Sequence, residues 1–146
     1  IELKYGIADL EAHVGPEMLL EVCEFLRRRA KSQFTFLRNL TAVDWKDAGQ
    51  IELVYHLCPF PDMTTVCIKC RVPREAPSVD SVTGLWPGAN WLEREVLDLF
   101  GVEFKGHPDP RRIMLPPEWE GHPLRKDYVH KEPELPCIPR NFKPTN

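Results

Sequence analysis

Residues 90–104 read NWLEREVLDLFGVEF and carry the strongest fold signal in the chain. Their apolar side chains recur at helical spacing, at Leu92, Val96, Leu99 and Phe100. This spacing predicts a helix with one apolar stripe that packs against a sheet. Asn90 is a residue type that favours the start of a helix, and Gly101 is one that favours its end. We therefore expect a helix over residues 90–100 with its apolar stripe buried.

The charged residues of this helix lie beside or opposite the stripe. At about 100° per residue, Glu93 and Glu95 flank the stripe on opposite sides, and Arg94 points away from it. Glu95 and Asp98 share one flank, so two carboxylates could stand close together. These two carboxylates could either form ion pairs with arginines elsewhere in the chain or act in general acid–base catalysis. Because no Ser, Cys or His nucleophile lies beside them at a recognisable spacing, we favour the ion pairs.

The chain N-terminal to this helix contains both helical and strand patterns. Gly15-Pro16 ends one short helical pattern and begins a second, which extends to Ala30. Apolar and polar residues alternate, as in strands, over residues 34–42, 51–57 and 64–72. Residues 59–62 are typical of a turn, which predicts an antiparallel hairpin from the last two strands. We therefore expect an α+β fold, a two-layer domain with an antiparallel or mixed sheet covered by helices.

Proline divides the chain into two parts. Nine of the 15 prolines fall in the last 42 residues, where they remove backbone donors and limit regular structure. We therefore predict an α+β domain over residues 1–104 and an extended Pro-rich C-terminal arm over residues 105–146. Residues 1–104 carry 11 basic and 16 acidic side chains, whereas residues 105–146 carry 8 and 6, so the arm is mildly basic.

Composition excludes several classes of protein. The formal net charge of −3 argues against a nucleic-acid-binding protein, which usually has a strong basic excess. No apolar run approaches the roughly 20 residues of a membrane-spanning helix. We therefore expect any membrane association to be indirect, through partners. Glycine-rich phosphate loops are also absent from the sequence, so neither dinucleotide nor triphosphate binding is supported.

The cysteines and histidines leave one alternative open, a free-standing metal or redox module. Cys67 and Cys70 have C-x-x-C spacing, but a strand sends positions three apart to opposite faces, so the pair does not close easily on one metal. The other candidate ligands lie in the arm, and none forms a compact pair. They are His107, His122, His130, Asp109, Asp127 and Cys137.

The basic residues of the arm also allow two interpretations. Arg111, Arg112, Arg125 and Lys126 follow two His-Pro steps, at His107 and His122, that favour extended backbone. These side chains pair either with the acidic first domain or with an external partner rich in carboxylates, since guanidinium groups suit bidentate contacts.

The sequence resembles a known family over most of its length. The matching segments are residues 81–86, WLEREVLDLFGVEF at 91–104, GHPDPRRI at 106–113 and WEGHPLRKDY at 119–128. Together they resemble the signature of the 30-kilodalton subunit (designated C) of respiratory complex I, the proton-pumping NADH:quinone oxidoreductase. Pro110 departs from the usual pattern, which has Leu at this position, and we expect only the local turn to differ.

The resemblance implies a non-catalytic structural subunit of the peripheral arm of the complex. Such a chain has no catalytic residues, cofactor or metal of its own, while the complex uses FMN, iron–sulfur clusters, NADH and quinone. The implied partner is the large quinone-site subunit, and the implied location is the cytoplasmic side of the bacterial plasma membrane or, alternatively, the matrix face of the mitochondrial inner membrane. The same signature occurs in the equivalent subunit of membrane-bound nickel–iron hydrogenases, which is the alternative within the superfamily.

In that setting we expect the helix and the arm to form a subunit interface. Its proposed residues are Glu93, Arg94, Glu95, Asp98, His107, Asp109, Arg111, Arg112, His122, Arg125, Lys126, Asp127 and Tyr128.

Overall fold

The computed structural model describes residues 2–5, 10–59 and 64–130, and it has an α+β fold. The described residues form seven strands: β1 (Glu2–Tyr5), β2 (Leu10–Val14), β3 (Phe36–Trp45), β4 (Gln50–Cys58), β5 (Val66–Pro73), β6 (Ser78–Asp80) and β7 (Glu103–Lys105). The helices are α1 (Leu19–Arg28) and α2 (Ala89–Phe100), with short 3₁₀ helices η1 (Pro16–Met18) and η2 (Lys46–Ala48).

The main sheet is mixed, as expected. Its order is β1-β2-β5-β4-β3, in which β2 and β5 are parallel and the other neighbours antiparallel. The expected β4–β5 hairpin is confirmed, with Tyr55 opposite Ile68 and Leu53 opposite Cys70. The turn expected at residues 59–62 lies almost entirely outside the described residues. A second, two-stranded parallel sheet joins β6 to β7.

Two local expectations are wrong. The pattern before Gly15 forms strands rather than a helix, because Ala12 and Val14 alternate into the core and β2 completes a parallel pair with β5. Asn90 does not cap α2, which begins one residue earlier without a side-chain cap. Instead, backbone hydrogen bonds of the preceding turn stabilise the first residues of α2, since the Ala89 N–H donates to the Trp86 carbonyl at 2.9 Å.

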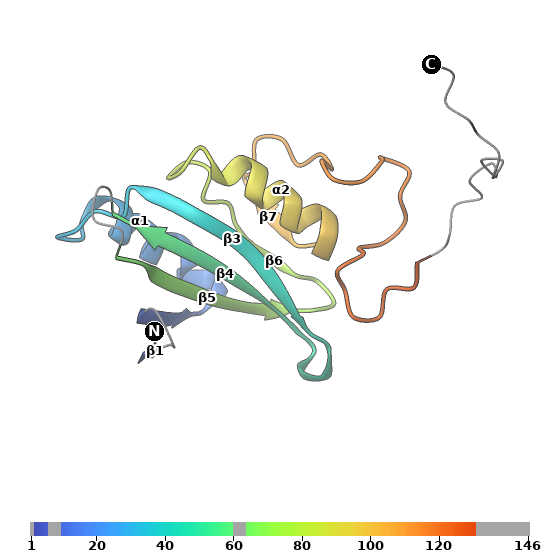
Figure 1. Ribbon diagram of the computed structural model, residues 1–146, viewed down its shortest axis with the longest axis horizontal. Coiled ribbons are helices and arrows are strands. Elements are labelled where there is room, and N and C mark those ends of the chain that lie inside the picture. The colour runs from blue at the N-terminus through green and yellow to red at the C-terminus, as the bar shows by residue number, and fades with distance from the viewer. Residues whose placement is uncertain (1, 6–9, 60–63, 131–146) are drawn as a thin grey trace, which may run out of the picture.

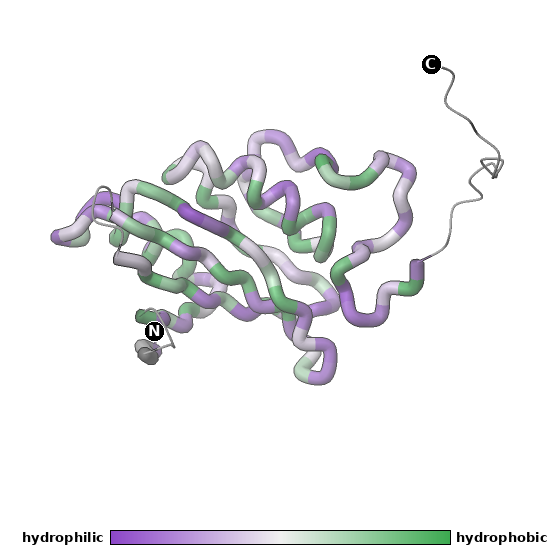
Figure 2. Tube along the Cα trace, viewed as in Figure 1, coloured by the Kyte–Doolittle hydropathy of each residue, from purple (hydrophilic) through white to green (hydrophobic). Residues whose placement is uncertain are grey.

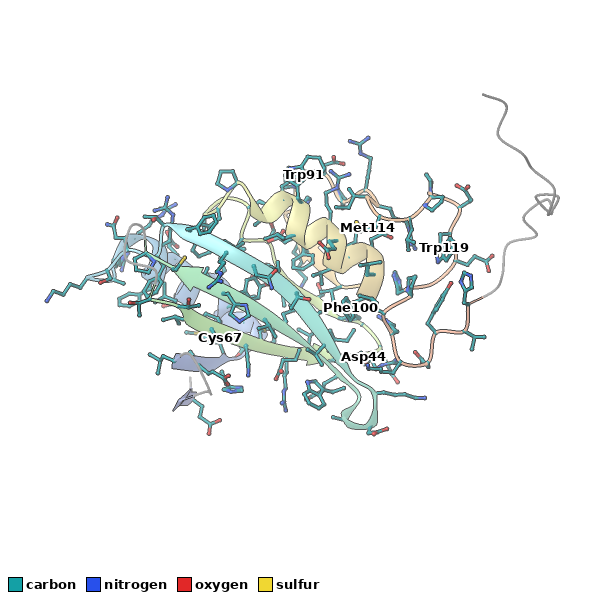
Figure 3. All side chains as sticks on the ribbon, in the orientation of Figure 1. Asp44, Cys67, Trp91, Phe100, Met114 and Trp119 are labelled. Carbon is teal, nitrogen blue, oxygen red and sulfur yellow. The ribbon has the colours of Figure 1, made fainter. Side chains whose placement is uncertain are left out.

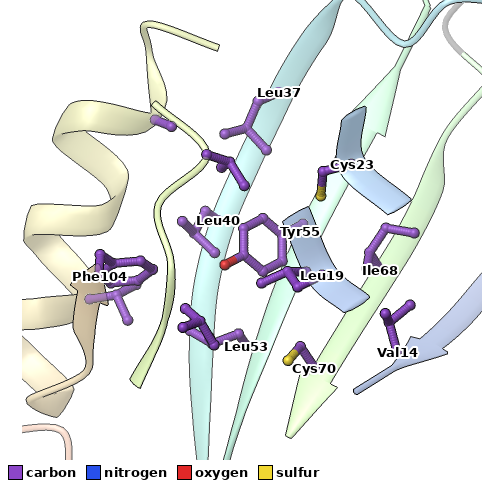
Figure 4. Close-up of a cluster of buried hydrophobic side chains, with 14 of the residues drawn as sticks. Val14, Leu19, Cys23, Leu37, Leu40, Leu53, Tyr55, Ile68, Cys70 and Phe104 are labelled. Carbon is purple, nitrogen blue, oxygen red and sulfur yellow. The ribbon is translucent and has the colours of Figure 1, made fainter. Parts of the chain in front are cut away.

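One face of the main sheet carries the core. Figure 4 shows Leu19 and Cys23 of α1 and Phe104 of β7 around Tyr55 and Leu40 of the sheet. On the β3 side of the sheet, α2 contributes Val96 and Phe100 to the same buried cluster. The two layers are therefore the sheet and a cover made of α1, α2 and the small sheet, as Figure 1 shows.

The other face of the sheet carries charged residues together with a few apolar ones, among them Val43 and Trp45. Along the strands hydrophobic and hydrophilic residues alternate (Figure 2), as in a sheet with one solvated face. Ion pairs at 2.7 Å join Lys69 to Glu11 and Arg71 to Glu52 on neighbouring strands. Cys67, labelled in Figure 3, and Cys70, labelled in Figure 4, lie at positions of opposite parity on β5. Burial raises the pKa of the Cys70 thiol to about 12, which suits a structural residue.

Residues 106–130, named the arm segment below, contain no helix or strand and cross α2 on their way out of the domain (Figure 1). The arm segment places charged residues of its own, such as Asp109 and Arg112, next to the charged residues Arg94 and Asp98 of α2. Within the described part of the chain, no helix is long and apolar enough to span a bilayer.

Candidate functional site

Asp98 of α2 holds the middle of the arm segment. Its side chain is fully buried, and its Oδ2 accepts the backbone N–H groups of Ile113, Met114 and Leu115 at 3.1, 2.8 and 3.0 Å. Its Oδ1 accepts a 2.8 Å bond from the Arg112 guanidinium. A carboxylate with charge-assisted partners of this kind is strongly stabilised when buried. Asp98 therefore serves as an anchor, and its oxygens are occupied by donors rather than free for acid–base catalysis.

The C-terminal end of α2 is capped by the following part of the arm segment. The last carbonyls of a helix have no partner within the helix. Here the His122 Nδ1 lies 2.9 Å from the Asp98 carbonyl, and the Leu124 N–H donates to the Leu99 carbonyl at 3.1 Å. The Arg125 Nε donates to the Phe100 carbonyl at 2.7 Å, which also places a positive charge at the negative end of the helix dipole.

A third anchor ties the arm segment to the end of β3. Asp44 is buried, and its carboxylate accepts two bonds from Arg74, at 2.7 and 3.0 Å, and one from the Lys126 N–H at 2.8 Å. These donors, chiefly Arg74, lower the pKa of Asp44. Arg74 also bonds Asp127, so it bridges the domain and the arm. Lys126 contributes its backbone rather than its side chain to this anchor.

The N-terminal half of α2 contacts the start of the arm segment through Arg94. The Arg94 Nε donates to the Arg111 carbonyl at 2.9 Å, and its Nη1 lies 3.4 Å from Asp109. Its guanidinium also lies 5.2 Å from the centre of the Trp91 ring, a cation–π contact. Asp109 is held by a two-pronged pair with Arg111, at 2.6 and 2.8 Å, which lowers the pKa of that carboxyl to about 2.

Glu93 is buried at the junction of α2, the β6–α2 loop and the arm segment. Its Oε1 accepts the Val82 N–H and its Oε2 accepts the Ser81 hydroxyl, both at 2.7 Å. Its Oε2 also lies 3.8 Å from the Nε2 of His107, whose side chain is 2% exposed. Burial raises the pKa of Glu93 to about 7, and the bonds from Ser81 and Val82 offset part of that rise.

We expect Glu93 to make the stability of the protein fall as the pH rises. Its pKa is higher in the folded chain than the ordinary value of 4.5, so its protonation favours folding and this contribution is lost from about pH 4.5 to pH 7. Relative to Glu93→Gln, the wild type should lose about 2 kcal/mol of unfolding free energy between pH 5 and pH 7. Urea unfolding of both proteins across this range measures the difference, and a constant difference would contradict the prediction.

Apolar side chains point outward from the same surface. Trp91, Met114, Leu124 and Val129 are 64, 59, 48 and 80% exposed. Figure 3 places Trp91 and Met114 on the outer side of α2 and Trp119 farther along the arm segment. The polar groups of the segment are thus used to hold it on α2, while several large apolar groups remain uncovered.

The structure gathers most of the predicted interface residues but differs from the expectation for the charged residues of α2. Arg94 points away from the apolar stripe, as expected, but it is buried under the arm segment, and Glu93, which was expected to flank the stripe, is buried as well. Asp98 is buried under the arm segment whereas Glu95 is exposed, so these carboxylates do not act as a pair. The arm segment covers Arg94 and Asp98 on the side of α2 opposite the sheet, whereas Glu93 is buried chiefly by the β6–α2 loop, through Ser81 and Val82.

Two residues that hold the arm segment on the domain, Arg74 and Asp44, were not predicted from the sequence. Arg74 carries no pattern that distinguishes it. Asp44 had a signal, because it continues the inward alternation of Leu40 and Ala42 with a charged residue. Among the described residues no group of three His, Cys, Asp or Glu side chains could hold a metal ion, and Cys137 lies outside them.

Comparison with known proteins connects this surface to a family. The profile of the family described as the 30 Kd subunit of respiratory-chain NADH dehydrogenase matches residues 12–134. In Roseiflexus sp. (strain RS-1), the NADH-quinone oxidoreductase subunit designated C is 49% identical over 120 residues, which are 82% of this chain and 69% of the relative. The subunit of the same designation in Moorella thermoacetica is 46% identical over 129 residues, 88% of this chain and 85% of the relative.

Two solved structures share the fold. A chain of the membrane-bound sulfane sulfur reductase, an archaeal respiratory membrane complex, superposes with a TM-score of 0.75 at 32% identity, covering 88% of this chain and 76% of that one. The trypsin-resistant fragment of Nqo5 superposes with a TM-score of 0.63 at 33% identity, covering 74% of this chain and 88% of that one. The chain therefore belongs to the family of the 30-kilodalton subunit of respiratory-chain NADH dehydrogenase, also named NADH-quinone oxidoreductase.

Proposed function

We propose that this chain is a non-catalytic structural subunit of the peripheral arm of proton-translocating NADH:quinone oxidoreductase. It docks on the large quinone-site subunit and supports electron transfer from NADH to quinone by holding that subunit in place. FMN, the iron–sulfur clusters, NADH and quinone are bound by other subunits. The chain is peripheral and reaches the membrane only through the complex, on the cytoplasmic face of a bacterial plasma membrane or, alternatively, on the matrix face of the mitochondrial inner membrane.

One observation carries the proposal. The arm segment satisfies its charged and backbone groups against α2 and β3, through Asp98, Asp44 and the end of α2, yet it leaves large apolar side chains exposed. Exposed apolar groups rimmed by fixed polar residues are typical of protein–protein interfaces. The family relationship supports a partner within the same complex, because the named relatives are subunits of NADH-quinone oxidoreductase.

Reversing the charge of Arg94 and Arg112 together is expected to prevent assembly. Arg94→Glu places a carboxylate next to Asp109, and Arg112→Glu places one against Asp98, so the arm segment loses two of its attachments to α2. We expect the assembled band on native gels to fall at least tenfold. The matched control is Arg28→Glu, which reverses an exposed arginine of α1. Normal assembly of the double variant would contradict the proposal.

Affinity capture of the tagged full-length chain from solubilised native membranes tests the partner. Recovery of flavin, iron–sulfur and membrane subunits, with inhibitor-sensitive NADH:quinone activity, is the expected result. The second candidate is the equivalent subunit of a hydrogenase-type complex, and the structural similarity to a chain of an archaeal respiratory membrane complex supports a complex of another type only in that general sense. Recovery of a nickel-containing large subunit would establish that candidate, and recovery of the chain alone would contradict both.

A further inference from the structure

A pocket opens in the part of the arm segment beyond the Asp98 anchor. Its volume is about 600 Å³, and it is lined by Pro116, Glu118, Trp119, Glu120, Gly121, Tyr128 and Val129. Most of its wall is apolar, and the aromatic rings stand close together. The rings of Trp119 and His130 stack with centroids 5.6 Å apart, and the Tyr128 ring lies 6.5 Å from that of His130. We name this feature the Trp119 pocket.

The two sides of the pocket are fixed by anchors already described. Residues 113–115 are held by Asp98, and residues 122–127 are held by the end of α2 and by Asp44. At the base of the pocket, Gly121 has a φ of +83°, and a Cβ there would lie 3.1 Å from the Tyr128 ring. The pocket is therefore preformed in the free chain, which reduces the entropic cost of binding a partner.

One polar group in the pocket wall lacks a partner. The indole Nε1 of Trp119 is buried, and no hydrogen-bond acceptor reaches it from the described residues. A buried donor without an acceptor costs free energy, which a ligand with a well-placed oxygen recovers. The carbonyl groups of an extended peptide are free to accept such a bond, whereas those inside a helix are already used.

The rim of the pocket gives the charge and hydropathy of the ligand. The exposed Glu118 on its wall favours a basic neighbour. Val129, which is 80% exposed, extends the apolar wall outward and favours an aliphatic or proline side chain. Grooves lined by aromatic rings commonly receive extended proline-containing segments in this way.

We propose that the Trp119 pocket receives an extended, aliphatic or proline-containing segment of the large quinone-site subunit, with a basic side chain beside it that pairs with Glu118. A backbone carbonyl of that segment accepts the hydrogen bond of the Trp119 indole. This inference rests on the proposed function, because it names the element of the partner that the same surface receives.

Competition during assembly tests the indole donor. Cells that make the complex express two differently tagged copies of the full chain, one wild type and one Trp119→Phe, and mass spectrometry gives their ratio in the purified complex. Trp119→Phe keeps an aromatic wall but removes the donor, so we expect its incorporation to fall roughly three- to tenfold. Trp45→Phe, on the face of the sheet opposite the core, is the matched control and should compete equally with wild type.

Photo-crosslinking identifies the occupant. In the Val129→p-benzoylphenylalanine variant the reactive ring replaces an exposed side chain at the rim of the pocket. We expect it to crosslink to one peptide of the large subunit that is rich in aliphatic residues or proline and carries Lys or Arg. A crosslink to an acidic peptide or to another subunit would overturn the inference, as would equal incorporation of Trp119→Phe. If even the wild-type chain failed to enter the complex, the proposed function itself would fail.

Discussion

Asp98→Asn should lower the free energy of unfolding by about 4 kcal/mol, because it removes the charge that holds the arm segment on α2. In the wild type one carboxylate accepts three backbone N–H groups and one guanidinium bond while fully buried. An amide of the same size keeps one oxygen but turns an NH₂ group toward donors. The Arg112 guanidinium, which is partly buried, then loses its counter-charge.

Urea unfolding measures the global effect, and hydrogen exchange locates it. The amides of Ile113, Met114 and Leu115 should lose protection in Asp98→Asn, while those of the β4–β5 hairpin should change only in line with global stability. Glu95→Gln is the matched control, since Glu95 is exposed on the same helix and should change stability by less than about 0.5 kcal/mol. Equal effects of the two substitutions would show that Asp98 does not anchor the arm segment.

The central strands of the sheet were largely predictable from the sequence because a single pattern, the alternation of side chains between the two faces of a strand, describes them. Ile51, Leu53, Tyr55 and Leu57 occupy alternate positions and are buried on one face, as the alternation predicts, although Val54 interrupts the polar series on the other face. The same reasoning placed Cys70 with the core side chains and Cys67 on the opposite face of the strand. The strands before Gly15 were missed because they are short, and only the pairing of β2 with β5, and of β1 with β2, selects strand over helix.

The surface on α2 was harder to predict because two partners cover this helix. A single apolar stripe accounts for Val96 and Phe100, which face the sheet. Arg94 and Asp98 are buried by the arm segment instead, and Glu93 by the β6–α2 loop, through contacts between residues 11–17 positions apart that no local pattern encodes. The identity of these residues could be taken from the family resemblance, but their burial and partners required the three-dimensional structure.

Gly101→Ala should destabilise the protein by about 3 kcal/mol through two separate effects. Gly101 ends α2 with a φ of +73°, a conformation that costs an L-residue about 1–2 kcal/mol. A Cβ at this position would also lie 2.6 Å from the His122 Cδ2 and closer still to its Nε2. The imidazole must then move, and its bond to the Asp98 carbonyl is lost.

Gly106→Ala separates these two effects. Gly106 has nearly the same φ, +77°, but a Cβ there would meet nothing within 4 Å, so this variant carries the backbone cost alone. The difference between the two unfolding free energies therefore measures the packing of His122 on the end of α2. We expect that difference to be about 1–2 kcal/mol, with faster amide exchange at Leu124 in Gly101→Ala only. If the two variants were equally destabilised, the contact between His122 and α2 would contribute nothing to stability, and the bonds of Leu124 and Arg125 alone would hold the arm segment at the end of the helix.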